Sequence, residues 1–281
     1  MYKIMKKRLL NPQVVLMDVY APRIAKSAKA GQFIILRVDE KGERIPLTIA
    51  DYNVETGNVT IIFQIVGKTT LTLAALSQGD SILDFVGPLG VPSHFESVKK
   101  AAVIGGGLGL AIAYPQAKAL HNMGTEVDFI AGFRNKDLIF LEDEINKVSK
   151  RTFIATDDGS AGIKGFVTDV LKKLIEQGEE YDVVIAIGPL VMMKAVSELT
   201  KKYKIKTTVS LNPIMIDGTG MCGGCRVTVD GKTKFACVDG PEFDGHLVDF
   251  DEAIARSGMY KEIELNAVNK HKCKMEGIIN G

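Results

Sequence analysis

Ala101-Ala-Val-Ile-Gly-Gly-Gly-Leu-Gly109 places a short apolar run directly before a glycine-rich turn. The apolar run has the length of a buried strand, and the residues that follow have a helical pattern to about Met123. This order favours a dinucleotide site, because a tight turn lets backbone N–H groups and the positive helix end face phosphates. A glycine turn needed only for packing is the alternative. Pro115 inside the helix is expected to kink or shorten it.

Downstream of this stretch, strands alternate with helices. That alternation predicts a parallel sheet with helices on both faces, and we assign it to an α/β domain over residues 98–206. The expected strands are 127–132, 152–156 and 183–188, and the expected helices lie near 141–149, 166–177 and 190–203. After about Thr207 the chain reads as irregular, with a charged helix-like stretch and a Lys-rich tail.

Upstream, residues 1–97 read as short β-branched strands separated by Pro, Gly and Asn. This spacing predicts an antiparallel barrel or sandwich, interrupted by one short helix over 70–76. The density of Gly and Pro in 87–92 marks the domain boundary. The length of 281 residues suits two domains plus a small appendage. The expected strands are 14–19, 33–38, 47–50 and 59–66.

Composition excludes several classes of protein. Hydrophobic residues make up 46% and charged residues 25%, as in an ordinary folded globule, and the formal charge of +1 argues against a nucleic-acid partner. No apolar run approaches the roughly 18–20 residues that span a bilayer, so no membrane association is expected. The basic start lacks the apolar core of a secretion signal. Three of the four cysteines lie within sixteen residues, unlike a disulfide framework. We therefore expect a cytoplasmic protein.

Two further segments follow predicted strands at the same sheet edge as the glycine turn. Gly188-Pro-Leu follows one strand, and Thr156-Asp-Asp-Gly-Ser160 follows another. A carboxylate of Asp157 or Asp158 could accept hydrogen bonds from a ribose hydroxyl and repel a 2′-phosphate, which favours NAD(H) over NADP(H). The alternative is an Asp/Gly turn that needs no ligand. Arg134 and Lys136 in the neighbouring loop weigh against the preference.

In the expected barrel, Arg44-Ile-Pro-Leu-Thr48 places a guanidinium and a hydroxyl at a strand start. Gly67-Lys-Thr-Thr70 lies at the start of the short helix. Read alone, these would be a solvated arginine and a helix N-cap, so the residues themselves indicate at most an anion site.

The cysteines form the most specific pattern. Asp217, Cys222, Cys225 and Cys237 follow Asp-x4-Cys-x2-Cys-x11-Cys. Plant-type ferredoxins bind a 2Fe–2S cluster with Cys-x4-Cys-x2-Cys and a distant cysteine, and here Asp stands in the first position. Intervening glycines allow the backbone to wrap closely around a cluster. The alternatives are unreactive buried cysteines, or structural zinc held by three cysteines and Asp217, His246, His271 or Cys273.

Together these segments resemble the ferredoxin–NADP reductase superfamily, specifically its electron-transfer subunits, over nearly the whole chain. The order of a barrel, a nucleotide domain and a cysteine cluster carries the resemblance, and 44–48 looks like an Arg-x-Pro-x-Ser/Thr flavin motif. Asp217 and the segments Met221–Val227 and Phe235–His246 resemble the small subunits of NADH-dependent reduced ferredoxin:NADP+ oxidoreductases, also described as sulfide dehydrogenase beta subunits. The electron-transfer subunit of type B dihydroorotate dehydrogenase, which has a cysteine at that position, is the alternative.

The resemblance implies three cofactors: FAD, a 2Fe–2S cluster with one Asp ligand, and NAD(H). It implies a flavin-binding barrel over 1–97, a nucleotide-binding domain over 98–206 and a cluster segment with the tail over 207–281. Thr48 is expected near the flavin N5, with Arg44 on the FAD pyrophosphate. The other implied FAD-binding residues are Pro46, Leu47, Gln64, Ile65, Val66, Gly67, Thr69 and Thr70. The implied nucleotide-binding residues are Gly105, Gly106, Gly107, Gly109, Thr156, Asp157, Asp158, Gly188, Pro189 and Met192.

The resemblance also implies partners. A larger flavin and iron–sulfur subunit would complete an electron-bifurcating heterodimer, and ferredoxin would react through that complex. A zinc-stabilised nucleotide-binding sensor without redox turnover is the alternative from another class of function.

Overall fold

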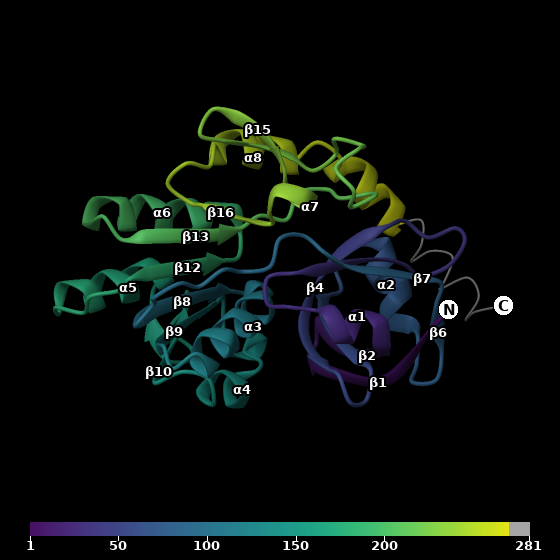
Figure 1. Cartoon of the computed structure of the whole chain (residues 1–281), viewed down its shortest axis with the longest axis horizontal. Helices are drawn as coiled ribbons and strands as arrows, with labels where there is room; N and C mark the ends of the chain where they lie inside the picture. Colours follow the sequence, from purple (N-terminus) through teal and green to yellow (C-terminus); the bar gives the residue numbers. More distant parts are fainter. Residues whose placement is uncertain (270–281) are drawn as a thin grey trace.

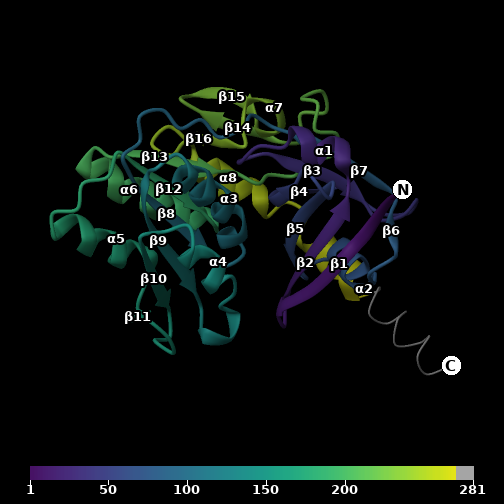
Figure 2. The same ribbon diagram turned by 60° about the horizontal axis from the view of Figure 1, so that its bottom comes forward.

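The computed structural model describes residues 1–269, and these form two seven-stranded sheets and a two-stranded hairpin. Figure 1 shows the first sheet, built from the N-terminal strands, beside the second, with the C-terminal segment lying across the top of both. The same arrangement is seen in the turned view of Figure 2. Within the described residues, no helix is both long and apolar enough to cross a bilayer.

The first sheet is an antiparallel, nearly closed barrel with strand order β6-β1-β2-β5-β4-β3-β7. This confirms the predicted antiparallel barrel. Its strands are β1 (Tyr2–Asn11), β2 (Val14–Tyr20), β3 (Phe33–Arg37), β4 (Ile45–Asn53), β5 (Asn58–Gln64), β6 (Ser81–Ile82) and β7 (Asp84–Leu89), with helices α1 (Pro22–Ser27) and α2 (Lys68–Ala75).

Strand β3 is apolar at every position from Phe33 to Leu36 because both of its faces are covered. Ile34 and Leu36 pack into the barrel core, whereas Phe33 and Ile35 pack against the C-terminal segment. A strand with one solvated face would alternate polar and apolar residues. The apolar run therefore indicates a second layer outside the barrel.

The second sheet is parallel except for its last strand, in the order β11-β10-β9-β8-β12-β13-β16. Helices cover both faces, as predicted: α3 and α4 pack on one side, and α5 and α6 on the other. The strands are β8 (Lys100–Gly106), β9 (Glu126–Phe133), β10 (Arg151–Thr156), β11 (Ile163–Lys164), β12 (Val183–Ile187), β13 (Lys206–Ser210) and β16 (Glu242–Asp244). The helices are α3 (Gly109–Asn122), η1 (Lys136–Leu138), α4 (Glu142–Asn146), α5 (Val167–Glu176) and α6 (Leu190–Tyr203).

Helix α3 runs through Pro115 over fourteen residues, so the expectation of a shortened helix is wrong. An interior proline removes one helical hydrogen bond and costs roughly 3 kcal/mol. Pro115, Leu110 and Leu120 are all buried, and the packing of α3 on the sheet offsets that cost.

The segment after Thr207 is more regular than its sequence suggested. It contains a hairpin, β14 (Arg226–Val229) and β15 (Lys232–Phe235), followed by α7 (Ala236–Asp239) and α8 (Phe250–Ser257). Asp230 and Gly231 turn the hairpin with φ of 52° and 67°, as an Asp-Gly turn between strands does. The prediction of an irregular chain here is therefore wrong. The Asp-Gly dipeptide in the sequence already indicated a hairpin. Strand β13 (Lys206–Ser210) crosses the predicted domain boundary between residues 206 and 207, and β16 pairs with it in the same sheet.

Candidate functional site

The glycine turn and the loop after β12 lie side by side at the carboxyl edge of the parallel sheet. Strands β8 and β12 are neighbours, with Ile187 opposite Gly105. Thr156 ends β10, two strands away from β8, at the same edge. Ligands of open parallel sheets bind at this edge. The structure thus brings together the three segments expected to bind a nucleotide.

Most of the glycines in this turn are required for packing. A Cβ added at Gly105 would lie 2.6 Å from Leu110 Cα, and one at Gly109 would lie 2.7 Å from Gly188 Cα. Added Cβ atoms at Gly106 and Gly188 would both strike Met192, so Met192 fills the gap between the two loops.

Gly107 differs from the other glycines of the turn. Its φ is +54° and an added Cβ would meet nothing within 4 Å, so its backbone remains open to a ligand. Pro189 forms the N-cap of α6 beside it. The packing interpretation of the turn therefore applies to Gly105, Gly106 and Gly109, and the ligand interpretation applies to Gly107.

In the Thr156–Ser160 turn, some polar side chains are hydrogen-bonded within the turn and one carboxylate is not. The buried Thr156 hydroxyl donates to the Ala161 carbonyl at 2.6 Å, which ties the turn together. Asp158 Oδ1 accepts from the Ser160 hydroxyl at 2.6 Å and from its N–H, and these bonds lower the pKa of Asp158. Asp157 is exposed and has no side-chain partner among the described residues. Of the two carboxylates, Asp157 is the one available to a ribose.

The two segments expected to bind FAD meet at the end of the barrel. Thr69, which is buried at the start of α2, donates from Oγ1 to Glu43 Oε2 at 3.3 Å, next to the exposed Arg44. The Thr70 hydroxyl accepts from Val66 N and Gly67 N and so completes the N-cap. The exposed side chain of Val66 and the half-buried Gln64, Ile65, Gly67, Pro46 and Leu47 surround this end. The contact of Glu43 brings its neighbour Arg44 near the start of α2, and a guanidinium at a helix N-terminus would suit a phosphate group.

Thr48 lies opposite Phe33 in the pairing of β4 with β3. Phe33 and Ile35 pack on the outer side of β3 in one apolar cluster with Cys225 and Cys237. The hydroxyl expected beside the flavin and the two buried thiols are thus separated by a single strand. The apolar run of residues 33–36 indicates that both faces of the strand are covered, but it does not indicate that the cysteines cover the outer face.

The cysteine loop brings two of its four predicted ligands, both buried, into contact. Cys225 Sγ and Cys237 Sγ are 3.2 Å apart, and both side chains are buried. Burial, and then the contact with Cys225, raise the pKa of Cys237 to about 12. The hydrogen bond from the Gly220 N–H lowers the pKa of Cys237, and the negative charge of Asp217 raises it.

Asp217 organises the loop and leaves Cys222 at the surface. Its Oδ1 accepts from Thr219 N at 2.6 Å, and its Oδ2 accepts from Cys222 N at 3.0 Å. These bonds, that from Thr219 first, lower the pKa of Asp217. Cys222 is exposed next to this carboxylate.

The donor set has the chemistry of an iron–sulfur site, although residues 1–269 hold no preformed cage of three or more ligating side chains. Thiolates with glycine-rich backbone around them suit such a cluster, and positive charge from iron would reverse the high thiol pKa. Gly218 and Gly220 have φ of 79° and 82°, and a Cβ at Gly218 would lie 2.7 Å from Leu89 Cδ1. The glycines thus let the loop press against the barrel.

The zinc alternative gains nothing from His246, which is the one of its two candidate histidines that the structure describes. His246 bonds Thr200 of α6 through Nε2 at 3.0 Å, so its ring serves another contact. His271 and Cys273 lie outside the described residues.

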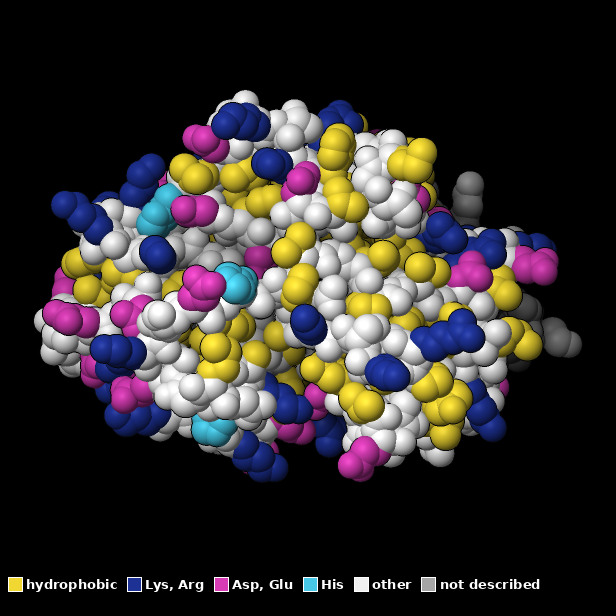
Figure 3. Space-filling model, in the orientation of Figure 1, with side chains coloured by type: hydrophobic (Ala, Val, Ile, Leu, Met, Phe, Trp, Pro, Cys, Tyr) yellow, Lys and Arg dark blue, Asp and Glu magenta, His cyan; other side chains and the backbone are white. Residues whose placement is uncertain are grey.

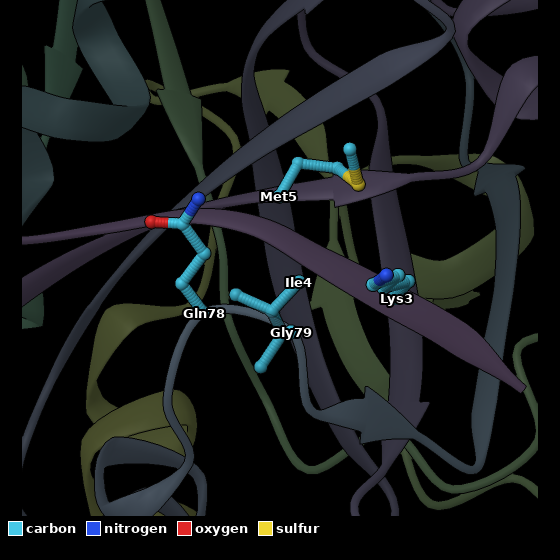
Figure 4. A pocket seen from close by; sticks show the side chains of 5 residues that line it. All are labelled: Lys3, Ile4, Met5, Gln78 and Gly79. Atoms are coloured by element: carbon cyan, nitrogen blue, oxygen red, sulfur yellow. The ribbon is translucent and has the colours of Figure 1, made fainter.

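A surface hollow on the barrel lies apart from these groups. Figure 4 shows its lining, which comes from β1 and the turn before β6 and consists of Lys3, Ile4, Met5, Gln78 and Gly79. No residue predicted to bind a cofactor contributes to it.

A barrel followed by a nucleotide-binding parallel sheet defines the class of the molecule, the ferredoxin–NADP reductase superfamily. The structure of the NADH-dependent reduced ferredoxin–NADP oxidoreductase, solved to study flavin-based electron bifurcation, contains a similar chain. That chain has 44% sequence identity and a TM-score of 0.91, and the match covers 96% of this chain and 97% of the other. Residues 212–249 match the iron–sulfur cluster binding domain of dihydroorotate dehydrogenase B.

Curated relatives narrow the class to a family. A dihydroorotate dehydrogenase B (NAD(+)) electron transfer subunit homolog from Thermotoga maritima is 47% identical over 93% of this chain and 92% of its own length. The corresponding electron transfer subunit from Fusobacterium nucleatum is 36% identical over 76% of this chain and 84% of its own length. The chain belongs to the family of dihydroorotate dehydrogenase B electron transfer subunits and their homologues.

Proposed function

We propose that this protein is an electron-transfer subunit that moves electrons between NAD(H), FAD and a 2Fe–2S cluster. The observation that carries the proposal is the place of β3, which has the Thr48 segment on one side and two buried cysteines against its outer face. Electron transfer requires cofactors held close together and shielded from water. The burial of Cys225 and Cys237 against this strand supports the proposal.

Each set of residues then has a separate task. Arg44 and the start of α2 would bind the FAD phosphates, and Thr48 would hold the hydrogen-bonding edge of the flavin. The open backbone at Gly107 would receive the pyrophosphate of NAD(H), and Asp157 would bind its ribose. When bound, the flavin supplies the exchange between two-electron and one-electron chemistry. Cys222, Cys225, Cys237 and Asp217 would hold the cluster.

We further propose a complex of the NADH-dependent ferredoxin:NADP+ oxidoreductase type, in which a larger subunit completes the enzyme. The support is the solved relative that matches 96% of this chain, together with Asp217 at the first ligand position. Besides the predicted nucleotide, flavin and cluster sites, we assign no site for an organic substrate within residues 1–269. One-electron output from the cluster therefore requires an acceptor on another protein.

A role beside dihydroorotate dehydrogenase is the second candidate. It is favoured by the match of residues 212–249 to the cluster-binding domain of that enzyme and by the named electron transfer subunits among the relatives. Both candidates share the electron-transfer chain within this subunit and differ only in the acceptor.

The test of the shared function is anaerobic purification followed by cofactor analysis and NADH titration. We expect flavin and cluster absorption, two irons per chain, and bleaching of both chromophores by NADH. A colourless protein that contains zinc would refute the electron-transfer function. Identification of the chain that co-purifies distinguishes the candidates, since a dihydroorotate-oxidising partner would overturn the ferredoxin-linked complex while leaving electron transfer intact.

A further inference from the structure

A carboxyl group lies where the barrel, the nucleotide-binding sheet and the cluster segment meet. Glu242 stands on β16, between the cysteine segment and the parallel sheet. Its Oε1 accepts from the Ser93 hydroxyl at 2.6 Å and from Gln116 Nε2 on helix α3. Ser93 is on the linker between the two sheets, so one oxygen atom joins three parts of the chain.

The barrel approaches the same oxygen. A Cβ added at Gly31 would lie 2.7 Å from Glu242 Oε1, and Ser93 N donates to the Ala30 carbonyl at 2.9 Å. The next residue, Gln32, accepts from Ile49 N at 3.0 Å through its carbonyl, beside Thr48. A continuous set of contacts therefore links Glu242 to the strand expected to hold the flavin.

One buried acceptor at this junction lacks a donor. Gln116 is fully buried, and its Oε1 has no hydrogen-bond partner. No group of the described residues donates to Glu242 Oε2. An ionised Glu242 would leave the buried Gln116 Oε1 unpaired, whereas a carboxylic acid supplies a hydrogen that satisfies it.

We propose that Glu242 binds a proton and pairs with Gln116 as a carboxylic acid with an amide, which seats helix α3 against the cluster segment. In this pair the Gln116 amide N–H donates to Oε1, and the Oε2 hydroxyl donates to the orphaned Gln116 Oε1. Because α3 begins at Gly109, its seating also sets the position of the predicted nucleotide turn. Glu242 is thus a positioning residue for the proposed reaction.

The surroundings favour the protonated form. Burial raises the pKa of Glu242 to about 7, against the smaller opposing effect of the hydrogen bonds from Ser93 and Gln116. No charged group adds to this shift, because those on the adjoining elements are engaged elsewhere or exposed. His94 pairs with Glu96 at 2.9 Å, Lys118 of α3 pairs with Asp51 at 2.8 Å, Asp244 accepts from His246 N at 2.9 Å, and Lys29 is exposed.

The sign of the pH dependence follows from this shift. The pKa of Glu242 is higher in the folded protein than the ordinary value of 4.5, so the folded state binds the extra proton. The resulting stability is complete below pH 4.5 and is lost as the pH rises through about 7.

The test compares the full-length chain with Glu242→Gln, whose amide can form the same pair at any pH. In urea unfolding at pH about 5 and about 8, we expect the midpoint of the wild type to fall relative to that of E242Q. Glu55→Gln is the matched control, because Glu55 is exposed and its removal should leave the pH dependence unchanged. A wild type and E242Q with the same pH dependence would overturn the proposal.

A second measurement observes the carboxyl directly. In the wild type labelled with ¹³C-glutamate, the resonance that E242Q lacks should titrate near neutral pH. If no glutamate resonance of the wild type titrates near neutral pH, the proposal is overturned, even if E242Q does not fold.

The kinetic measurement rests on the proposed function, whereas the two above do not. If only the paired form binds NADH well, KM for NADH rises about tenfold from pH about 6 to about 8 in the wild type, with little change in kcat. It should stay level in E242Q. A KM that rises equally in both would exclude the positioning role, and absence of NADH oxidation in both would count against the proposed function alone.

Discussion

At the scale of single residues, Asp217 carries the sharpest prediction. Its carboxylate already accepts from Thr219 N and Cys222 N, so it shapes the loop as well as offering a ligand. Replacement of Asp217 with Cys should retain a cluster with an altered potential, because a thiolate is a ligand of such clusters. Asp217→Ala should lower iron content or let solvent take the site.

The prediction for Asp217 is checked by iron analysis and by the redox potential of the cluster, followed through its absorption. Asp230→Asn on the hairpin turn is the control, because it removes an exposed carboxylate away from the ligand set and asparagine tolerates the positive φ of this position. An unchanged spectrum and potential in Asp217→Ala would exclude Asp217 as a ligand.

Asp157 carries the prediction on nucleotide preference. The wild type should prefer NADH over NADPH, and Asp157→Asn should reduce that preference about 5- to 30-fold, the effect of roughly 1–2 kcal/mol from a charge-assisted bond. The Lys136 backbone N–H donates to Ser160 Oγ at 2.8 Å, so the loop that carries the opposing cations Arg134 and Lys136 adjoins this turn.

Titration of flavin reduction with both nucleotides checks this prediction. Asp158→Asn is the comparison, because that carboxylate is already bonded to Ser160 and should matter less to the ribose. Equal affinity of the wild type for the two nucleotides would contradict the assignment.

At the scale of elements, the amino ends of β8, β9 and β10 are joined by an ionic network, far along the strands from the nucleotide edge. Arg151 binds the fully buried Asp128 and also Glu179, and Tyr181 donates to Asp128 at 2.7 Å. The hydrogen bonds from Arg151 and then Lys100 lower the pKa of Glu179 to about 2. The network fixes the strands from which the nucleotide loops emerge.

This network predicts acid sensitivity. A carboxyl whose folded pKa is lowered contributes stability above its ordinary value of 4.5, and loses it as the pH falls toward 2. The stability difference between the wild type and Glu179→Gln should therefore shrink between pH about 5 and about 2. Glu176→Gln, which removes a surface pair with Lys172 at 3.7 Å, should show no such convergence in the same unfolding series.

At the scale of the whole molecule, the cluster segment presents an apolar surface. Met221 is 89% exposed beside Cys222, and Ile216 and Val238 are exposed beside Asp217 and Cys237. Figure 3 shows hydrophobic side chains exposed along the top of the molecule, over the C-terminal segment. Exposed apolar groups around a predicted redox site indicate a protein interface.

This surface predicts where the larger subunit binds. Met221→Glu should weaken the complex at least tenfold, because about 1.4 kcal/mol or more of apolar contact is lost at the centre of the interface. Leu9→Glu on the barrel, where the side chain is 62% exposed, should leave the affinity unchanged. Binding of the purified subunits gives the two constants, and equal losses in both variants would remove the cluster face as the docking site.

The sequence by itself determined the elements and their classes. The apolar runs of β8, β9, β10 and β12, the glycine turn at Gly105–Gly109 and the cysteine spacing are local patterns, and each arises from chemistry within a few residues. The antiparallel barrel and the parallel sheet followed from these patterns, and both are present. The hairpin at Asp230-Gly231 was also readable, although the chain around it was expected to be irregular.

Only the tertiary structure decided which distant groups meet. Phe33 touches the cysteine segment, Glu242 joins Ser93 to Gln116, and Met192 fills the space above Gly106, over separations of tens to about two hundred residues. Pro115 stays inside a helix because packing outweighs its local preference. Such contacts depend on how buried faces fit across elements, and residue spacing along the chain carries no record of that fit.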